Sequence, residues 1–427
     1  MPGSGRWRNA ARPRKSRRSR REESARVRSE PADGDAALPA SRDGLDVDLK
    51  KRIGTAAFAF RGYDVSNLGK SPELLEHKAF GPVVRAYLDE ASALCAEVVR
   101  RPVDLAARVR DRVETTLASF PEDVATIVAM ELAQVRLLEE FFDVPVHQAK
   151  LCFGYSLGEV AALIYGGVFA IDQALPIPLA LAEDCAELAA DTSMGIVFTR
   201  GPALPMPEVE RLCTAISSEG RGLIGPSAFL SPNTALVLGQ GDTLGRLESR
   251  LSEFLPIKVS LRRNPHRWPP LHTPLVWQRN IPNRTATALY KVGGGMSPPD
   301  PPILSCVTGA VSYDGVNSRD LMVRWTDHPQ RLWDAVAGTL ASGVEVVVHA
   351  GPEPKLIGAT FARLSNNVCK QVGHMGLNLL GHSVVPRMNL NRYTWLARLL
   401  PSQTALLRAP FVAHVTLEDW LLAQPLP

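Results

Sequence analysis

The segment Gly154-Tyr155-Ser156-Leu157-Gly158-Glu159 constrains this chain more than any other stretch. It lies between the short apolar run 144–153, typical of a strand, and the apolar segment 158–170, typical of a helix. Glycines on either side let a serine occupy a tight strand-to-helix turn, because they carry no Cβ that would clash. The turn exposes the serine Oγ and aims the next backbone N–H, that of Leu157, at a developing oxyanion. The pattern predicts an α/β sheet with a nucleophilic serine at the carboxyl end of a strand.

Composition is that of an ordinary globular protein. The chain has 427 residues, of which 45% are hydrophobic and 22% charged, so we expect one large domain with additions. Six cysteines show no paired spacing, so we predict neither a metal site nor a disulfide framework, and we expect reduced thiols in a cytoplasmic protein. No apolar run reaches roughly 18 residues, so no membrane span is predicted.

Basic charge is concentrated in the N-terminal tail. Residues 1–51 carry 14 Lys/Arg against 8 Asp/Glu, whereas the other 376 residues carry 34 against 36. The run 12–21 is rich in arginine and has almost no apolar content, so we expect the tail to be disordered. A contact with nucleic acid or an anionic membrane is an alternative, which we rank below a solvated tail or an upstream-misassigned start codon.

The spacing of apolar residues along the rest of the chain predicts where its strands, helices and domains lie. A first strand is expected at 55–60 and helices over 71–142, and residues 193–262 alternate as βαββαβ, the ferredoxin-like pattern. Residues 282–302 are rich in Gly, Pro, Asn and Thr and predict a surface loop. We therefore predict a parallel-sheet, α/β-hydrolase-like large domain at 52–192 and 269–370, with an inserted ferredoxin-like α+β subdomain at 193–268. A C-terminal extension follows at 371–427.

The C-terminal extension contains two amphipathic segments with tryptophans, at 392–401 and 415–422. Packing of these segments on the main domain is the simpler interpretation. The alternative is that they dock a partner through an aromatic anchor.

A nucleophilic serine needs a base, and His272 is the candidate among nine histidines. It stands in Leu271-His272-Thr273-Pro274-Leu275, just after the predicted subdomain, where the chain should return to the main sheet. An imidazole at that place would take the proton of Ser156 and later give it to the leaving group.

Five segments, in this order along the chain, resemble the malonyl-CoA:acyl carrier protein transacylase family, which includes the acyltransferase domains of fatty-acid and polyketide synthases. Residues 154–159 resemble its Gly-His-Ser-x-Gly-Glu elbow, and Ser231-Pro232-Asn233 its Asn-Ser-Pro turn. Residues 271–275 resemble its Phe-His-Ser-Pro-Leu segment. Residues 328–333 resemble its Asn-Pro-Val-x-Trp, and 348–352 its Glu-x-Gly-Pro. The resemblance runs from about residue 57 to 364.

The resemblance implies roles for individual residues. Ser156 is expected to carry an acyl ester and His272 to act as its base. The family orients this histidine with a backbone carbonyl, which by position would come from 341–343 and most directly from Ser342. The backbone N–H groups of Leu157 and Tyr63 would form the oxyanion hole. The acyl group would arrive on coenzyme A and leave on the phosphopantetheine thiol of an acyl carrier protein, with no tightly bound cofactor.

The chain also departs from the family. Its first loop is Phe60-Arg61-Gly62-Tyr63-Asp64 where the family has Phe-Pro-Gly-Gln-Gly, and Tyr155 replaces the histidine before the serine. Asp64 in place of a glycine puts the shape of this loop in question.

The arginine that binds malonate in the family, about 25 residues past the serine, is absent, and Leu181 stands nearest its place. An unpaired buried carboxylate would cost several kcal/mol. Either the acyl group is neutral or another cation, such as Arg200 or Arg263, takes over. Tyr155, Leu181 and Leu271 are the candidates for the acyl pocket.

Three functions remain open from the sequence. The leading hypothesis is an acyltransferase of fatty-acid or polyketide synthesis. A second is a serine thioesterase or hydrolase that clears acyl groups from misloaded carriers with the same two residues, so that water rather than a thiol resolves the acyl-enzyme. A third is a non-catalytic scaffold that binds carriers, against which the retention of Ser156 and His272 argues.

Overall fold

The computed structural model describes residues 42–114, 116–255, 257–374 and 405–425, all within one compact unit. The arginine-rich run 12–21 and the amphipathic segment 392–401 lie outside these residues. Within the described ranges, no helix is long and apolar enough to cross a membrane. The same residues contain no group of three or more His, Cys, Asp or Glu side chains that could hold a metal ion.

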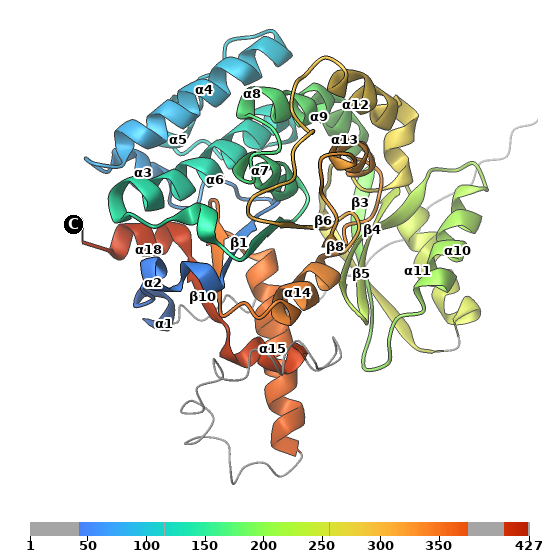
Figure 1. Cartoon of the computed structure of the whole chain (residues 1–427). Helices are drawn as coiled ribbons and strands as arrows, with labels where there is room; N and C mark the ends of the chain where they lie inside the picture. The colour runs from blue at the N-terminus through green and yellow to red at the C-terminus, as the bar shows by residue number, and fades with distance from the viewer. Residues whose placement is uncertain (1–41, 115, 256, 375–404, 426–427) are drawn as a thin grey trace, which may run out of the picture. The chain divides into compact units, whose positions relative to one another are not determined.

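A largely parallel sheet forms the centre of the molecule (Figure 1). Its strands, in spatial order, are β10 (Ala413–Thr416), β9 (Val346–Ala350), β1 (Ala56–Phe60), β2 (Leu151–Gly154), β7 (Ile303–Ser305) and β8 (Ala310–Val311). All neighbours pair in parallel except β7 and β8. Phe60 is in register with Gly154 on one side and Ala350 on the other, so the carboxyl ends of β1, β2 and β9 meet at one edge.

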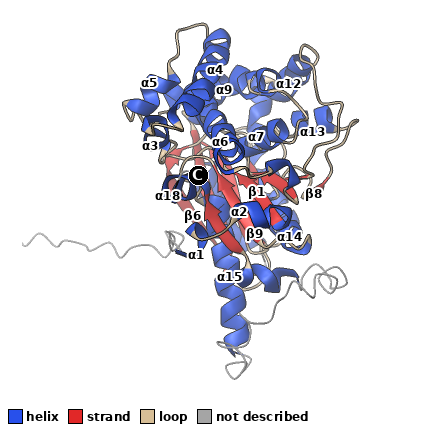
Figure 2. Cartoon of the chain, turned by 60° about the vertical axis from the view of Figure 1, so that its left-hand side comes forward, coloured by secondary structure: helices blue, strands red, loops and turns tan. Residues whose placement is uncertain are grey.

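Successive residues of β1 point to opposite faces of the sheet, so the core has two layers. Ala56, Phe58 and Phe60 of β1 contribute to one apolar cluster, whereas Ala57 and Ala59 contribute to another. Because both faces are apolar and fully buried, β1 reads as a continuous hydrophobic run, as expected for a parallel sheet covered on both sides. Figure 2 shows helices on either side of the sheet.

The helices that accompany this sheet differ widely in length. In chain order they are α1 (Arg42–Leu45), α2 (Leu49–Arg52), α3 (Ser71–Glu76), α4 (Gly81–Val99), α5 (Leu105–Arg110), α6 (Phe120–Phe142), α7 (Leu157–Tyr165), α8 (Ile171–Ala174), α9 (Pro176–Ala189), α12 (Ile281–Leu289), α13 (Ser318–Arg324), α14 (Leu332–Ala341), α15 (Leu356–His374) and α18 (Leu417–Ala423).

A separate antiparallel sheet forms from the middle of the chain. Its elements are β3 (Thr192–Thr199), α10 (Met206–Ser217), β4 (Ile224–Ser231), β5 (Thr234–Gln240), α11 (Thr243–Phe254) and β6 (Val259–Arg267), with strand order β4-β5-β3-β6. This succession confirms the predicted βαββαβ order. One face packs under α10 and α11, and the other gives Met194 and Leu238 to the second layer of the main core (Figure 1).

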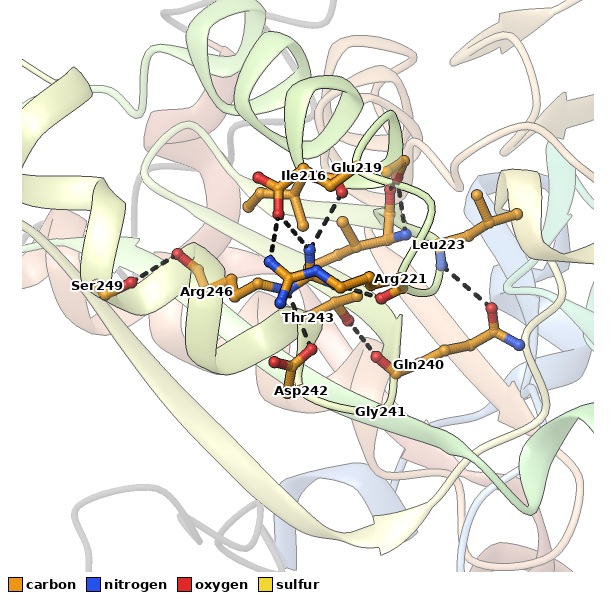
Figure 3. A network of polar contacts seen from close by, with 12 residues as sticks. Ile216, Glu219, Arg221, Leu223, Gln240, Gly241, Asp242, Thr243, Arg246 and Ser249 are labelled. Carbon is orange, nitrogen blue, oxygen red and sulfur yellow. Dashed lines mark hydrogen bonds and ion pairs between the residues drawn. The ribbon is translucent and has the colours of Figure 1, made fainter.

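A cluster of charged side chains ties α10 to α11 at the surface of the antiparallel unit (Figure 3). Arg246 donates to the carboxylates of Glu219 (2.8 Å) and Asp242 (3.0 Å), and also to the carbonyls of Ile216 and Arg221. Glu219 also accepts from Arg221 and Arg250, and these hydrogen bonds lower its pKa to about 2.

Three expectations were wrong. Residues 42–51, placed in the disordered tail, contain α1 and most of α2 and bury Leu49. The loop predicted at 282–302 begins with helix α12, which buries Ile281, Thr285 and Leu289 on one face. Residues 413–416 form β10, a sixth strand that was not predicted, and Trp420 in α18 packs against Phe142 with ring centroids 5.0 Å apart. The described C-terminal segment therefore packs on the main unit.

Candidate active site

Ser156 occupies a strained turn between β2 and α7. Its backbone angles, φ 55° and ψ −118°, lie in a region that non-glycine residues rarely adopt and that costs of order 1–3 kcal/mol. The surrounding packing fixes this shape, since a Cβ on Gly154 would lie 2.0 Å from the backbone of Gly158, and one on Gly158 would lie 2.3 Å from the carbonyl oxygen of Phe60. Both glycines of the motif are therefore required by close approach.

His272 lies against the serine with the geometry of a general base. Its Nε2 is 2.7 Å from Ser156 Oγ, and its Nδ1 is 2.6 Å from the carbonyl oxygen of Trp325. His272 is 4% exposed, and burial lowers its pKa to about 4 against the opposing effect of the hydrogen bond to Trp325. The imidazole is therefore neutral at pH 7 and able to accept the serine proton.

The carbonyl that orients His272 belongs to Trp325, so the prediction of Ser342 was wrong. Ser342 follows α14, where its N–H and its hydroxyl both bond to the carbonyl of Gly338. Trp325 follows α13, and its neighbour Thr326 accepts the His272 backbone N–H at 2.7 Å. Trp325 also donates its Nε1–H to the carbonyl of Ser156 (2.8 Å), so one buried residue bonds to both partners, to His272 through its backbone and to Ser156 through its side chain.

Gln330 is a site residue that sequence reasoning missed. It is fully buried, its Oε1 accepts the Ser156 backbone N–H at 3.0 Å, and its Nε2 lies 3.2 Å from His272 Nδ1. The sequence did show a polar residue, Gln330, in the segment 328–333, but that segment served only to support the family resemblance.

The loop after β1 lies beside the nucleophile. A Cβ on Gly62 would lie 2.8 Å from the carbonyl of Tyr155 and 3.2 Å from Ser156 Cβ. Asp64 is not among the residues with positive φ, so this loop needs no glycine at that position. Arg61 holds the loop from behind, donating to Gly62 O, Ser66 O, Pro352 O and Asn67 Oδ1.

The predicted donors of the oxyanion hole lie next to this loop and elbow. Leu157 is the first residue of α7, where a backbone N–H has no partner within the helix. Tyr63 follows Gly62, and its ring packs between Phe120 and Trp268 at 4.9 and 5.7 Å.

The three pocket candidates lie in apolar surroundings. Leu181, on α9, is 3% exposed in the same core cluster as Leu157, and Leu271 packs against the edge of that cluster. Tyr155 belongs to the second core layer, and burial raises the pKa of its hydroxyl.

Neither arginine considered as a substitute for the missing cation faces the serine. Arg263 pairs with Glu248 at 2.7 Å on the side of the antiparallel sheet that α11 covers. Arg200 follows the last residue of β3, whereas Trp268, near the site, bonds to the first residue, Thr192, roughly 25 Å of strand away. Helix α9 itself contains no Lys or Arg.

A strained serine bonded to a neutral histidine, at the carboxyl ends of parallel strands, is the arrangement of the serine-nucleophile α/β enzymes. No protein-family model matches the chain. It is 25% identical over 309 residues to a malonyl CoA-acyl carrier protein transacylase of Salmonella typhimurium, a match covering 71% of this chain and 91% of that protein. It is also 25% identical over 316 residues to the polyketide synthase GfsA of Streptomyces halstedii, covering 71% of this chain and 4% of that protein.

The solved structures that this chain resembles include proteins of the same kind. A type II polyketide synthase acyl-carrier protein in complex with its malonyl-transacylase is matched with a TM-score of 0.56 at 21% identity, over 71% of this chain and 91% of that chain. This chain is thus a divergent example of the fold shared by malonyl-CoA:acyl carrier protein transacylases and polyketide synthase acyltransferase domains.

Proposed function

We propose that this protein transfers an acyl group from coenzyme A to the phosphopantetheine thiol of an acyl carrier protein through an acyl ester on Ser156. The contact of 2.7 Å between Ser156 Oγ and His272 Nε2 carries the proposal. The named activities of the relatives support it. The βαββαβ order also supports an inserted ferredoxin-like subdomain at 193–268. We propose that the large domain around it is related to the α/β hydrolases.

The chemistry proceeds in two balanced steps. Ser156 Oγ attacks the thioester carbonyl while His272 Nε2 takes its proton, and the oxyanion is held by the N–H groups of Leu157 and Tyr63. The C–S bond breaks, and the coenzyme A sulfur leaves with the proton from His272. The carrier thiol then attacks the ester, His272 takes the thiol proton, and the proton returns to Ser156 Oγ as the ester bond breaks.

We propose an uncharged acyl group as the substrate. By the resemblance, Leu181 stands nearest the place of the arginine that binds malonate, and it lies within an apolar core. Burial of a free carboxylate there, without a cation, costs several kcal/mol. We therefore expect acetyl- or longer saturated acyl-CoA to load Ser156 faster than malonyl-CoA.

Exposed positive charge supports access for phosphate-bearing substrates on one side of the site. Edge strand β6 ends with His266 and Arg267, and Trp268, which follows, packs on Tyr63. Arg262 and Arg267 are both exposed. Coenzyme A and phosphopantetheine both carry phosphate, which arginine binds through charge-assisted hydrogen bonds.

The test is a donor panel followed by mass spectrometry of the intact protein. We expect an acyl adduct on Ser156 with neutral donors, lost in Ser156→Ala and retained in the control Ser218→Ala, whose exposed hydroxyl bonds only locally. Addition of a phosphopantetheinylated carrier should discharge the adduct at least tenfold faster than buffer alone. Discharge by water at the same rate would identify a hydrolase instead, and no adduct from any donor would favour the scaffold.

A further inference from the structure

Gln330 joins the two sheets at the point where they approach the nucleophile. Its backbone N–H donates to Ser227 O and its carbonyl accepts from Phe229 N–H, each at 2.8 Å, so its main chain adds to the edge of β4. The residue lies between α13 and α14 and is completely buried. These bonds fix the direction from which its side chain enters the site.

The Ser156 backbone fixes the orientation of the Gln330 amide. A backbone N–H can only donate, so the group 3.0 Å from it must be the amide oxygen. The amide NH₂ is then the group that faces His272 Nδ1 at 3.2 Å.

The Trp325 carbonyl fixes the proton on His272. A carbonyl oxygen only accepts, so the 2.6 Å contact requires the proton on Nδ1 and leaves Nε2 free for the hydroxyl of Ser156. The Gln330 NH₂ therefore faces an N–H group and cannot donate to it. Its positive end lies against the ring, where it opposes the positive charge that protonation would create.

We propose that Gln330 is a positioning residue with two effects: its amide oxygen holds the strained Ser156 turn, and its amide NH₂ disfavours a protonated His272. The inference rests on the proposed acyl transfer. In the family segment that residues 328–333 resemble, a valine stands at this position, and a valine side chain has no polar atom for either contact.

Two variants separate the effects. In Gln330→Glu the carboxylate still accepts from Ser156 N–H, but it now attracts a protonated imidazole. We expect the pH midpoint of Ser156 acylation to rise by at least about one unit. In Gln330→Met the Ser156 N–H loses its acceptor, and we expect the maximal acylation rate to fall at least about tenfold with little change in donor KM. Its pH midpoint should rise less than that of Gln330→Glu.

The measurement is single-turnover acylation by a donor that loads the wild type, from pH 4 to 9, with Tm recorded for each variant. Gln134→Met is the matched control, because Gln134 is equally buried and its Oε1 accepts a backbone N–H, that of Gly351, at 2.8 Å. We expect it to lower Tm without moving the pH midpoint.

The outcomes separate the two proposals. A wild-type protein that forms no Ser156 adduct contradicts the proposed function. A wild type that acylates, with wild-type midpoints and rates in both Gln330 variants, overturns the inference alone. If Gln330→Glu does not fold, the rate and midpoint of Gln330→Met decide.

Discussion

Two arginines in this molecule each bind four acceptors, with very different surroundings. Arg61 is 4% exposed and donates to three backbone carbonyls and one amide oxygen. Arg246 lies at the surface of the antiparallel unit and donates to two carboxylates and two carbonyls (Figure 3). The first holds a loop beside Ser156, and the second joins two helices away from it.

The contrast shows that position and the charge of the acceptors, more than the number of hydrogen bonds, decide what an arginine does, because the four acceptors of Arg61 are uncharged and two of those of Arg246 are carboxylates. Burial lowers the pKa of Arg61, and the carboxylates of Asp64, Glu131, Glu418 and Glu353 partly offset this effect. Burial also raises the pKa of Glu131 well above its usual value. Such a cluster is costly to disturb, whereas an exposed one is buffered by water and salt.

Replacement of Arg61 should have the largest effect. Arg61→Ala takes a charged donor away from four acceptors, most of them buried, and frees the loop that carries Tyr63, so we expect a loss of about 3–5 kcal/mol in the free energy of unfolding. Urea denaturation measures this loss. The acylation rate of the protein that remains folded should fall as well, because the proposed oxyanion hole includes the N–H of Tyr63 in this loop.

Arg61→Lys serves as the control for charge. Lysine keeps the positive charge but cannot reproduce the planar fork of donors, so we expect an intermediate loss of stability. If Arg61→Ala were as stable and as active as the wild type, Arg61 would not be the anchor of the loop.

A histidine pair, of which His349 is fully buried and His414 partly buried, should give the next largest effect, a loss of stability at acidic pH. His349 Nε2 lies 3.0 Å from His414 Nδ1, and burial lowers the pKa of His414 to about 4. The unfolded chain binds a proton near pH 6.5, so the folding free energy that depends on neutral His414 is complete above that pH. It is lost as the pH falls from about 6.5 to 4, by up to about 3 kcal/mol.

His414→Phe isolates this contribution. Subtracting the variant's unfolding free energy from that of the wild type, between pH 7 and 4, cancels the opposite effects of Glu159 and Glu418, whose pKa values burial raises to about 7. The difference should shrink by about 3 kcal/mol over this range. A difference that stays constant with pH would contradict the assignment. Glu219 acts mostly below this pH range. Because its pKa is lowered, the stability that its charged form contributes is lost as the pH falls from about 4.5 to 2.

Arg246→Met should have the smallest effect. The methionine keeps most of the apolar stem and removes two ion pairs and two hydrogen bonds to carbonyls at the rim of the antiparallel unit, so we expect a loss of about 1–2 kcal/mol. Thermal unfolding at 0.05 and 1 M NaCl should show the loss shrinking with salt, and acylation of Ser156 should be unchanged. A large, salt-independent loss would place Arg246 with Arg61 and break the comparison.

The spacing and periodicity of residues along the sequence predicted those helices, strands and turns that form from neighbouring residues. The elbow and the βαββαβ order were accessible from spacing and periodicity, and the pairing of Ser156 with His272 from the position of His272 after the subdomain and the resemblance to the family's motifs. Helix α12 was also accessible, because Ile281, Thr285 and Leu289 recur every four residues, but the many turn-forming residues after it led to a loop prediction.

The remaining site residues depend on contacts between distant parts of the chain. The carbonyl that orients His272 was predicted at 341–343. The chain supplies it at Trp325, at the end of a different helix. Gln330 reaches Ser156 across 174 residues. Strand β10 is short and, among the strands that the structure describes, pairs with β9 alone, so its sequence does not distinguish it from the helix that follows.

Strand β10 has a consequence for how the protein is made. Because chains emerge from the ribosome N-terminus first, β9 and its run Val346-Val347-Val348 are complete long before residues 413–416 exist. Until then this valine-rich strand is an open edge of the sheet, the kind of edge that recruits strands from other chains. A premature stop anywhere between β9 and β10 would leave that edge permanently uncovered, so truncated products should accumulate in aggregates even though they contain both Ser156 and His272.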